Sequence, residues 1–321
     1  TLRMMAGLEL PTKGEIYIDG EEVGMKPASQ RDIAFVFQMF ALYPHMNVRK
    51  NISYPLKSQG MPRAAIEQKV GEIAEILGIT EILDRPVGGL SGGDRQRVAL
   101  GRAIVRDPKA FFMDEPLGAL DAEFREHMSE ELRALHDRMN ATTVYVTHDQ
   151  LEAMQMGDKI VVMNHGVVEQ FGVPQSIYDW PATKFVAEFI GSPPMNFLDF
   201  QGTAGKGATN VSFGNATFEI PRLLEGQSGD LTFGVRPEHI RLDDNAHFRG
   251  EISAVEYLGT TQIITLNTMA GIVKVRSSSS NKVLIGDKTG LSFDPRTVTI
   301  FNARNGQALK SEANNGVLLN G

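Results

Sequence analysis

Apolar residues in the first part of the chain alternate between short continuous runs and longer stretches with helical spacing. Four runs have the length of strands: 15–20, 33–38, 109–116 and 142–149. The stretches at 66–79 and 123–139 repeat apolar residues every three or four positions, which predicts amphipathic helices. Strands that alternate with helices are typical of an α/β fold with a largely parallel sheet, and the runs at 109–116 and 142–149 are expected to be buried in it.

Beyond about residue 190 the helical pattern fades, and short β-type runs separated by Gly, Asn and Ser turns replace it. A hairpin is predicted just before this change, at 159–170 around Asn164-His165-Gly166. The later predicted strands are 234–242, 250–259, 261–267, 271–277 and 298–302. Many short strands predict a small β-barrel domain. We place the boundary at 191–194, which gives domains 1–190 and 195–321.

Composition narrows the possible functions. At 321 residues the chain is long enough for two domains, and 42% hydrophobic with 22% charged residues is typical of a globular protein. A formal net charge of −7 argues against nucleic-acid binding. The chain has no cysteine, which excludes disulfides and thiolate metal sites. The longest apolar runs are strand-sized, so any membrane role is expected to depend on a partner.

Polar side chains stand at the ends of three predicted strands. Asp114 and Glu115 end the run at 109–116, His148 follows another run, and Gln38 ends a third. The carboxyl ends of strands in an open α/β sheet converge on one crevice. Adjacent strand residues point in opposite directions, so one acid can hold Mg²⁺ through water while the other reaches an attacking water. Taken singly, each residue is equally compatible with a solvated turn, a structural histidine or a loop.

The stretch "LSGGDRQRVALGRA" at 90–103 joins two glycines to a predicted helix. Ser91 is a candidate N-cap, and Asp94 three residues later completes an S-x-x-D capping box. Leu100, Ala103 and Ile104 are expected to form the buried stripe of the helix. The backbone N–H groups of the Gly92-Gly93 pair, together with the helix dipole, also predict an anion site.

The order and spacing of "LSGGDRQRVALGRA", "FFMDEPLGALD" and "VTHDQ" resemble the ATP-binding subunit of an ABC transporter. The similarity extends to "VFQMFALYPHMNVRKNI", "EFIGSPPMNFL" and "GVRPEH", and so covers nearly the whole chain. The later motifs resemble the carbohydrate-import branch, of the maltose and glycerol-phosphate type. The resemblance implies a P-loop-type α/β ATPase domain with a helical subdomain at about 46–107, followed by an OB-like β-barrel regulatory domain.

The resemblance implies ATP and Mg²⁺ as ligands and assigns catalytic roles. Gln38 corresponds to the Q-loop residue that senses Mg²⁺ and the attacking water, and Asp114 ends the Walker B strand as a metal-facing residue. Glu115 corresponds to the general base, and His148 to the switch histidine that contacts the γ-phosphate.

The remaining site residues imply a homodimer in which ATP lies between two subunits. Ser91, Gly92, Gly93 and Asp94 would face the ATP held by the opposite subunit, and Asp121 would lie in the D-loop at the dimer seam.

The resemblance also implies membrane partners. The segment 39–46 corresponds to the surface that receives two transmembrane permease subunits, with docking at Phe40, Tyr43, Pro44 and His45. Exposed aromatic rings at Phe40 and Tyr43 would suit an apolar cleft, whereas ordinary packing beneath the helical subdomain is the alternative. An extracytoplasmic solute-binding protein would act indirectly, and a cytosolic regulator could bind the C-terminal domain. The protein would then be peripheral, on the cytoplasmic face of the inner membrane.

Two features depart from the family pattern. The phosphate-loop motif G-x-x-x-x-G-K-[ST] does not occur in the sequence, and "TLRMMAGLE" directly follows that loop in such ATPases. We therefore expect this chain to begin downstream of the loop and not to hydrolyse ATP by itself.

The second departure is Asp94, which stands where the family usually has Gln. A carboxylate about 8 Å from a phosphate charge costs about 2 kcal/mol at an effective dielectric constant of 20. Arg95, Arg97 and the helix dipole reduce that cost, so Asp94 is expected to be tolerated.

Three alternatives remain at this stage. The first is an importer ATPase for a polyamine or an inorganic ion, because such ATPases share these motifs. The second is an ABC ATPase without a transport role. The third is a binding module in which the β-rich region recruits a regulator and the ATPase half is degenerate.

Overall fold

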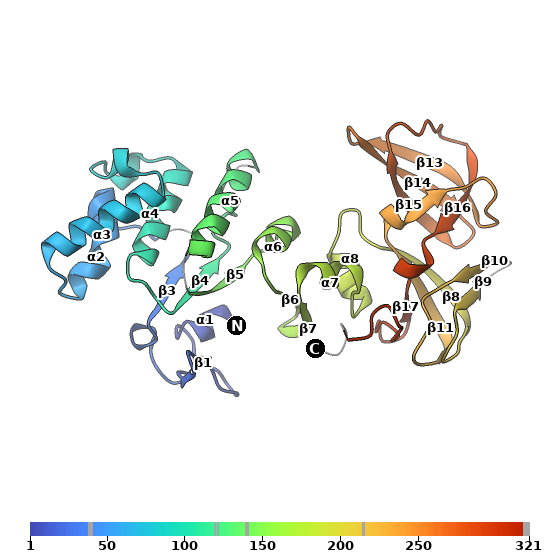
Figure 1. The fold of residues 1–321 in the computed structure, drawn as a ribbon, viewed down its shortest axis with the longest axis horizontal. Helices are drawn as coiled ribbons and strands as arrows, with labels where there is room; N and C mark the ends of the chain where they lie inside the picture. The colour runs from blue at the N-terminus through green and yellow to red at the C-terminus, as the bar shows by residue number, and fades with distance from the viewer. Residues whose placement is uncertain (38–40, 119, 121, 139–140, 214–215, 317–321) are drawn as a thin grey trace. The chain divides into compact units, whose positions relative to one another are not determined.

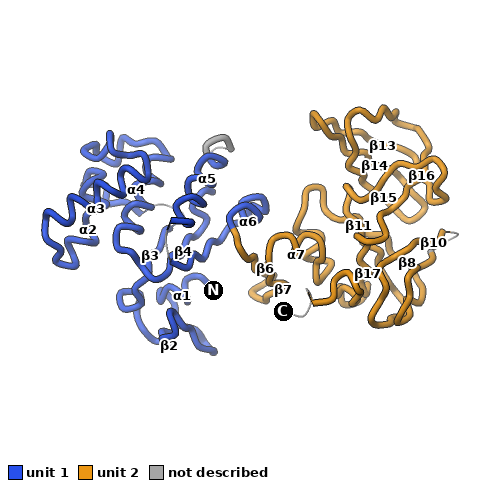
Figure 2. Tube along the Cα trace, viewed as in Figure 1, with its two compact units in different colours: residues 1–156 blue, residues 157–321 orange. Residues whose placement is uncertain are grey.

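The computed structural model describes residues 1–37, 41–118, 120, 122–138, 141–213 and 216–316. The chain divides into two compact units, Thr1–Met156 and Gly157–Gly321 (Figure 2). Each unit has a hydrophobic core of its own.

Unit 1 combines a parallel sheet with helices (Figure 1). Its helices are α1 (Leu2–Met5), α2 (Val48–Ser58), α3 (Arg63–Ile76), α4 (Gly92–Ile104), α5 (Ala122–Arg138) and α6 (Gln150–Met156). Its strands are β1 (Tyr17–Ile18), β2 (Glu21–Glu22), β3 (Ile33–Val36), β4 (Ala110–Asp114) and β5 (Thr142–Val146). The described strands β3, β4 and β5 pair in that order, all parallel. The predicted parallel α/β arrangement is therefore confirmed.

Strand β4 contributes side chains to both faces of this sheet. Phe111 and Met113 pack into the large cluster with the helices, whereas Ala110 and Phe112 join a second cluster with Leu2 of α1. Successive strand residues point to opposite faces, so a strand covered on both sides reads as a continuous apolar run.

Strand β5 is less buried than the sequence predicted. It ends at Val146, both its end residues are exposed, and its middle residues are half-buried. The expectation of a buried strand at 142–149 is therefore wrong. The physical reason is position, because β5 lies at an edge of the sheet that the described strands form.

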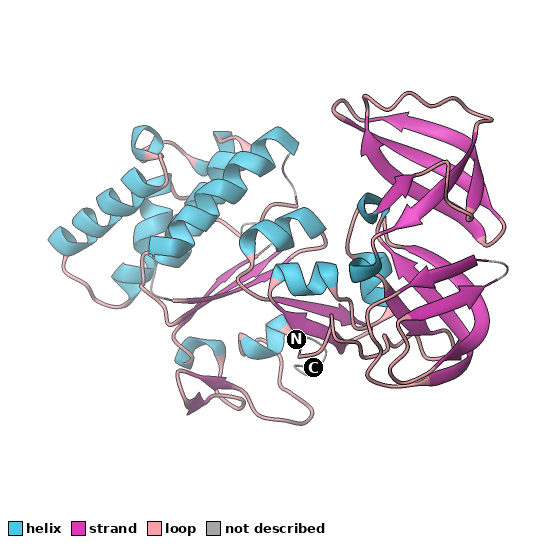
Figure 3. Cartoon of the chain, turned by 45° about the vertical axis from the view of Figure 1, so that its right-hand side comes forward, coloured by secondary structure: helices cyan, strands magenta, loops and turns pink. Residues whose placement is uncertain are grey.

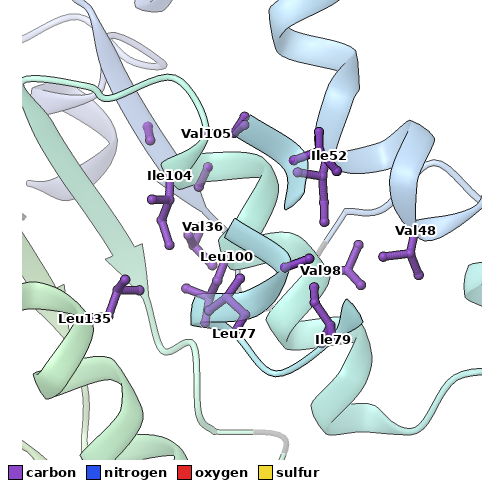
Figure 4. Close-up of a cluster of buried hydrophobic side chains, with 14 of the residues drawn as sticks. Val36, Val48, Ile52, Leu77, Ile79, Val98, Leu100, Ile104, Val105 and Leu135 are labelled. Atoms are coloured by element: carbon purple, nitrogen blue, oxygen red, sulfur yellow. The ribbon is translucent and has the colours of Figure 1, made fainter. Parts of the chain in front are cut away.

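Helices α2, α3 and α4 pack against one another around buried aliphatic side chains (Figure 4). Ile52, Leu77, Val98 and Leu100 are buried in this core. The helices approach closely at Gly101, where a Cβ atom would lie 3.1 Å from a Leu77 methyl group and 3.3 Å from one of Ile52. The apolar stripe predicted for α4 faces this core.

Unit 2 is built mainly from antiparallel strands (Figure 3). Its helices are α7 (Pro174–Asp179) and α8 (Lys184–Phe189). Its strands are β6 (Ile160–Asn164), β7 (Val167–Gly172), β8 (Asn196–Ala204), β9 (Asn210–Phe213), β10 (Ala216–Glu219), β11 (Gln227–Val235), β12 (Ile240–Leu242), β13 (Arg249–Tyr257), β14 (Thr261–Thr268), β15 (Gly271–Ser278), β16 (Lys288–Phe293) and β17 (Thr299–Asn302). Two sheets run in the orders β17-β11-β8 and β12-β16-β13-β14-β15, and β6-β7 and β9-β10 are hairpins.

The predicted hairpin at 159–170 is present as β6 and β7. Its two-residue turn has positive φ at both positions, 47° at His165 and 84° at Gly166. This is the geometry of a type I′ turn, whose twist matches that of the flanking strands.

The single strand predicted at 234–242 is wrong. Strand β11 ends at Val235, a short 3₁₀ turn spans Pro237–His239, and β12 begins at Ile240. Pro237 has no N–H to donate to a strand partner, so the ladder is interrupted there. The sequence pattern also missed β8, which pairs along β11 from end to end.

A buried arginine joins the helical segment of unit 2 to its strands. Arg236 is 1% exposed, and its guanidinium donates to the backbone oxygens of Tyr178 and Ile190 over 2.6–2.9 Å. The guanidinium carbon also lies 3.7 Å from the centre of the Tyr178 ring. Gly191 has φ of 115°, and a Cβ atom there would lie 2.6 Å from the Arg236 guanidinium.

Candidate active site

Two of the predicted residues meet beyond the ends of β4 and β5. The Nδ1 atom of His148 lies 3.3 Å from Oε1 of Glu115. The backbone explains the meeting, because the N–H of Glu115 donates to the carbonyl oxygen of Val146 at 2.9 Å. Two residues whose strands are adjacent are therefore brought side by side.

Glu115 has an unusual backbone conformation, with φ of 46°. A non-glycine residue in the left-handed region costs conformational energy and occurs often at functional sites. Its side chain is 30% exposed, and that of His148 is 71% exposed. A carboxylate and an imidazole that both reach solvent can accept and hold protons from a bound ligand or water.

Asp114 lies at the last position of β4 and is half-buried. Among the residues that the structure describes, no cluster of three or more His, Asp or Glu side chains could hold a metal ion. Mg²⁺ is commonly held by one or two carboxylates together with water and ligand phosphates, so Asp114 fits that kind of site. The other predicted metal-facing residue, Gln38, lies outside the described residues, as does Asp121.

The glycine turn before α4 has the geometry of a helix cap. The Oγ atom of Ser91 accepts a hydrogen bond from the N–H of Asp94 at 3.1 Å, which confirms Ser91 as the N-cap. The Asp94 carboxylate accepts from the Ser91 hydroxyl at 2.8 Å. The expected capping box had this carboxylate accept from a backbone N–H instead. The difference is physically reasonable, because a hydroxyl–carboxylate bond is charge-assisted and short.

Gly92 and Gly93 form the first turn of α4. The first N–H groups of any helix lack acceptors within that helix, and the helix dipole is positive at this end. Gly93 is buried and Gly92 is half-buried. The turn can therefore present amides to an anion, with Asp94 beside it as an opposing charge.

The segment after 40 differs from the expected exposed aromatic surface. Tyr43 is half-buried, with its ring 4.8 Å from that of Tyr54 and 5.1 Å from the guanidinium carbon of Arg102. Arg102 also donates to Ala41 O at 2.8 Å. A cation above an aromatic ring is attractive, which explains why Tyr43 packs inward.

Pro44 and His45 are exposed, as a docking surface requires. Phe40 lies outside the described residues.

The residues that hold the His148 loop were not predicted from the sequence. The Oδ1 atom of Asp149 accepts from the N–H groups of Leu151 and Glu152 at 2.8 and 3.3 Å, so Asp149 caps α6. The Thr147 hydroxyl accepts from the Asp149 N–H at 2.9 Å. The D-x-x-E spacing of Asp149 and Glu152 is a capping signature that could have revealed them.

In the part of the chain that the structure describes, no helix is long and apolar enough to cross a bilayer.

Three family models match the chain. Residues 1–118 match the model for "ABC transporter", residues 191–240 match "MalK OB fold domain", and residues 233–301 match "TOBE domain".

Curated relatives match over most of their length. The trehalose/maltose import ATP-binding protein MalK of Thermococcus litoralis is 46% identical, over 96% of this chain and 88% of the relative. The sn-glycerol-3-phosphate import ATP-binding protein UgpC of a Ruegeria species is 46% identical, over 92% of this chain and 86% of the relative. The trehalose import ATP-binding protein SugC of Mycobacterium tuberculosis is 43% identical, over 96% and 87%.

Proposed function

Because the chain belongs to the family of ABC transporter ATP-binding proteins, we propose that it powers the import of a sugar or a glycerol-phosphate-like solute. Members of this family are ATPases, and the pair formed by Glu115 and His148 is the observation that carries the assignment of the hydrolytic site. The proposed substrate class is that of the relatives, which import trehalose, maltose or glycerol 3-phosphate.

Each residue of the site has a distinct proposed role. Glu115 accepts a proton from the attacking water. Its half-buried carboxylate is positioned by the hydrogen bond from its own backbone N–H to the carbonyl oxygen of Val146. His148 contacts the terminal phosphate and lies against Glu115. Mg²⁺, when bound with ATP, supplies positive charge beside the phosphates, and Asp114 and Gln38 would hold it.

Two copies of the chain form the complete site in this proposal. The Ser91-Gly92-Gly93 turn of one copy presents backbone amides to the phosphates bound by the other, and Asp121 lies at the seam. The cap geometry at Ser91 supports this role, since its hydroxyl accepts from the N–H of Asp94 and donates to the Asp94 carboxylate at the start of α4. An anion is favoured at the N-terminus of such a helix.

The membrane partners are two permease subunits, which bring the protein to the cytoplasmic face of the membrane. We place their docking at Phe40, Tyr43, Pro44 and His45, of which Pro44 and His45 are exposed. Tyr43 contacts both α2 and α4. A movement of this surface is therefore transmitted to α4, the helix whose N-terminus faces the nucleotide. A solute-binding protein delivers the solute, and unit 2 offers a regulatory surface.

Reconstitution tests the proposed import function. The protein, expressed from its whole gene together with permease subunits and a solute-binding protein, is placed in lipid vesicles with the candidate solutes. We expect ATP hydrolysis to rise severalfold with a sugar or glycerol phosphate on the binding-protein side. Stimulation by a polyamine or an inorganic ion alone would overturn the substrate class. Failure to co-purify with permeases would instead favour a non-transport ATPase or a binding module.

Asp94→Gln in that assembly is expected to change the ATP turnover by less than about tenfold, or roughly 1.4 kcal/mol. Gln keeps an oxygen that can accept from the Ser91 hydroxyl, and it removes a charge that the helix dipole already offsets. The comparison is between the steady-state ATPase rates of this variant and of Asp137→Asn, a control at an exposed position of α5. A larger change would mean that Asp94 acts on the bound phosphate directly.

A further inference from the structure

The loop that carries His148 is held on both sides of the histidine. Thr147 precedes it and Asp149 follows it, and the Thr147 hydroxyl accepts from the Asp149 N–H at 2.9 Å. Asp149 in turn accepts from the N–H of Glu152 at 3.3 Å, in the first turn of α6. The segment 147–149 is therefore held by hydrogen bonds on both sides of His148, whose side chain is 71% exposed.

The hydroxyl groups of Thr147 and Tyr145 meet at one buried carboxylate, that of Glu152. Glu152 is 5% exposed, and its Oε2 atom accepts from the Thr147 hydroxyl at 2.7 Å and from the Tyr145 hydroxyl at 3.0 Å. Burial, and then the charge of Glu152, raises the pKa of Tyr145 above its usual range, so this hydroxyl remains a donor. A buried carboxylate is costly unless its oxygens are satisfied, and here two donors share one oxygen.

Arg125 supplies the opposite charge and links the network to the segment after β4. Its Nε atom lies 3.7 Å from Oε1 of Glu152, which is an ion-pair distance and too long for a hydrogen bond. Its other nitrogens reach Asp149 Oδ2 at 3.4 Å and donate to Leu120 O at 3.0 Å. The network thus connects the start of α5, the end of β5 and the start of α6.

We infer that Glu152 is a positioning residue of the hydrolytic site, which holds the His148 imidazole against Glu115 through Thr147 and Asp149. The inference rests on the proposed roles of Glu115 and His148. A capping role alone would have Glu152 bond back to the backbone N–H of the cap residue. Its oxygen instead binds the side chains of Thr147 and Tyr145, and Thr147 adjoins His148 in the chain.

Glu152→Gln is the primary test, made in the assembled transporter. The amide keeps the shape of the side chain, but it has one acceptor oxygen and places an NH₂ group among hydroxyl donors. We expect kcat for ATP to fall on the order of 10–100-fold, because a small misplacement of a reacting group has an effect of this size. KM for ATP should stay within about twofold, since no contact to the nucleotide is removed.

The crystal structure of Glu152→Gln gives a readout that does not depend on activity. The separation of Nδ1 of His148 and Oε1 of Glu115 should exceed about 3.5 Å, beyond hydrogen-bond distance. An unchanged separation of 3.3 Å would overturn the inference.

Two variants of Thr147 test whether the loss in kcat has a cause other than misfolding. Thr147→Val removes the hydroxyl that links Glu152 to the loop and should reproduce the loss in kcat, whereas Thr147→Ser should restore it. Glu130→Gln, an exposed acid on α5, is the matched control and should have normal kinetics. Equal losses in Thr147→Val and Thr147→Ser would contradict the proposed link.

The double variant His148→Ala with Glu152→Gln separates this inference from the proposed function. If Glu152 acts through His148, the double variant should be no slower than His148→Ala alone. If the losses in kcat of the two single variants multiply in the double variant, Glu152 acts independently of His148, which overturns the inference. Normal turnover in His148→Ala would refute the role proposed for His148, while the crystallographic separation would still decide whether Glu152 positions the ring.

Discussion

Glu115→Gln should lower the ATP turnover number by about 10²–10⁴-fold, the range typical of a lost general base. Glutamine has nearly the same shape as glutamate, but its amide cannot take a proton from water. The backbone of residue 115 would stay in place, because its N–H bond to Val146 does not involve the side chain. Nucleotide binding should therefore survive while hydrolysis stops.

A closed dimer that retains ATP is the expected state of this variant. The measurements are the steady-state ATPase rate of the assembled transporter and the size in solution of the ATPase subunit, expressed from its whole gene, with and without ATP. We expect an ATP-dependent shift from monomer to dimer that persists, and no such persistence with Glu130→Gln. Hydrolysis at more than about a tenth of the normal rate would assign the base to another group.

The fold of unit 1 could be predicted well because its signals are local. The run that became β4 is apolar without interruption, and Phe111 and Phe112 face opposite sides of the sheet as that pattern requires. The cap at Ser91 could equally be predicted from the sequence, since its partner Asp94 is three residues away. Short-range hydrogen bonds and strand periodicity are properties that a single sequence displays directly.

Features that depend on distant contacts could not be predicted in the same way. Tyr43 packs inward because Arg102 of α4 lies against its ring. The sequence around residue 43 does not indicate that contact. The interruption at Pro237 was a missed local signal, since proline cannot continue a strand ladder.

The candidate site likewise combines features that the sequence predicts with features that depend on distant contacts. The meeting of Glu115 with His148 follows from the order of β4 and β5 in the sheet, which the carboxyl-end rule anticipates. The burial of Glu152 does not follow, because an acid at the third position of a helix is ordinarily a solvated capping residue. Its burial depends on Tyr145 and Arg125, which reach it from β5 and α5.

The second large effect is expected from the buried arginine of unit 2. Arg236 donates to two backbone oxygens and lies against the Tyr178 ring, and burial lowers the pKa of its guanidinium. Burial and a 2.5 Å hydrogen bond to Glu238 raise the pKa of Tyr178 to about 12, so that ring stays neutral beneath the cation. The cation therefore satisfies carbonyl groups that have been removed from water.

Arg236→Met should destabilise unit 2 by about 3–5 kcal/mol, because methionine fills much of the space but leaves those carbonyl oxygens without a donor. The free energy of unfolding and the thermal midpoint are measured by circular dichroism, and the midpoint should fall by roughly 6–20 °C. Arg241→Met, at an exposed position on β12, is the matched control and should change the midpoint little. Should Arg236→Met unfold within about 2 °C of the parent protein, the guanidinium would not be what joins the segment of α7 and α8 to the strands.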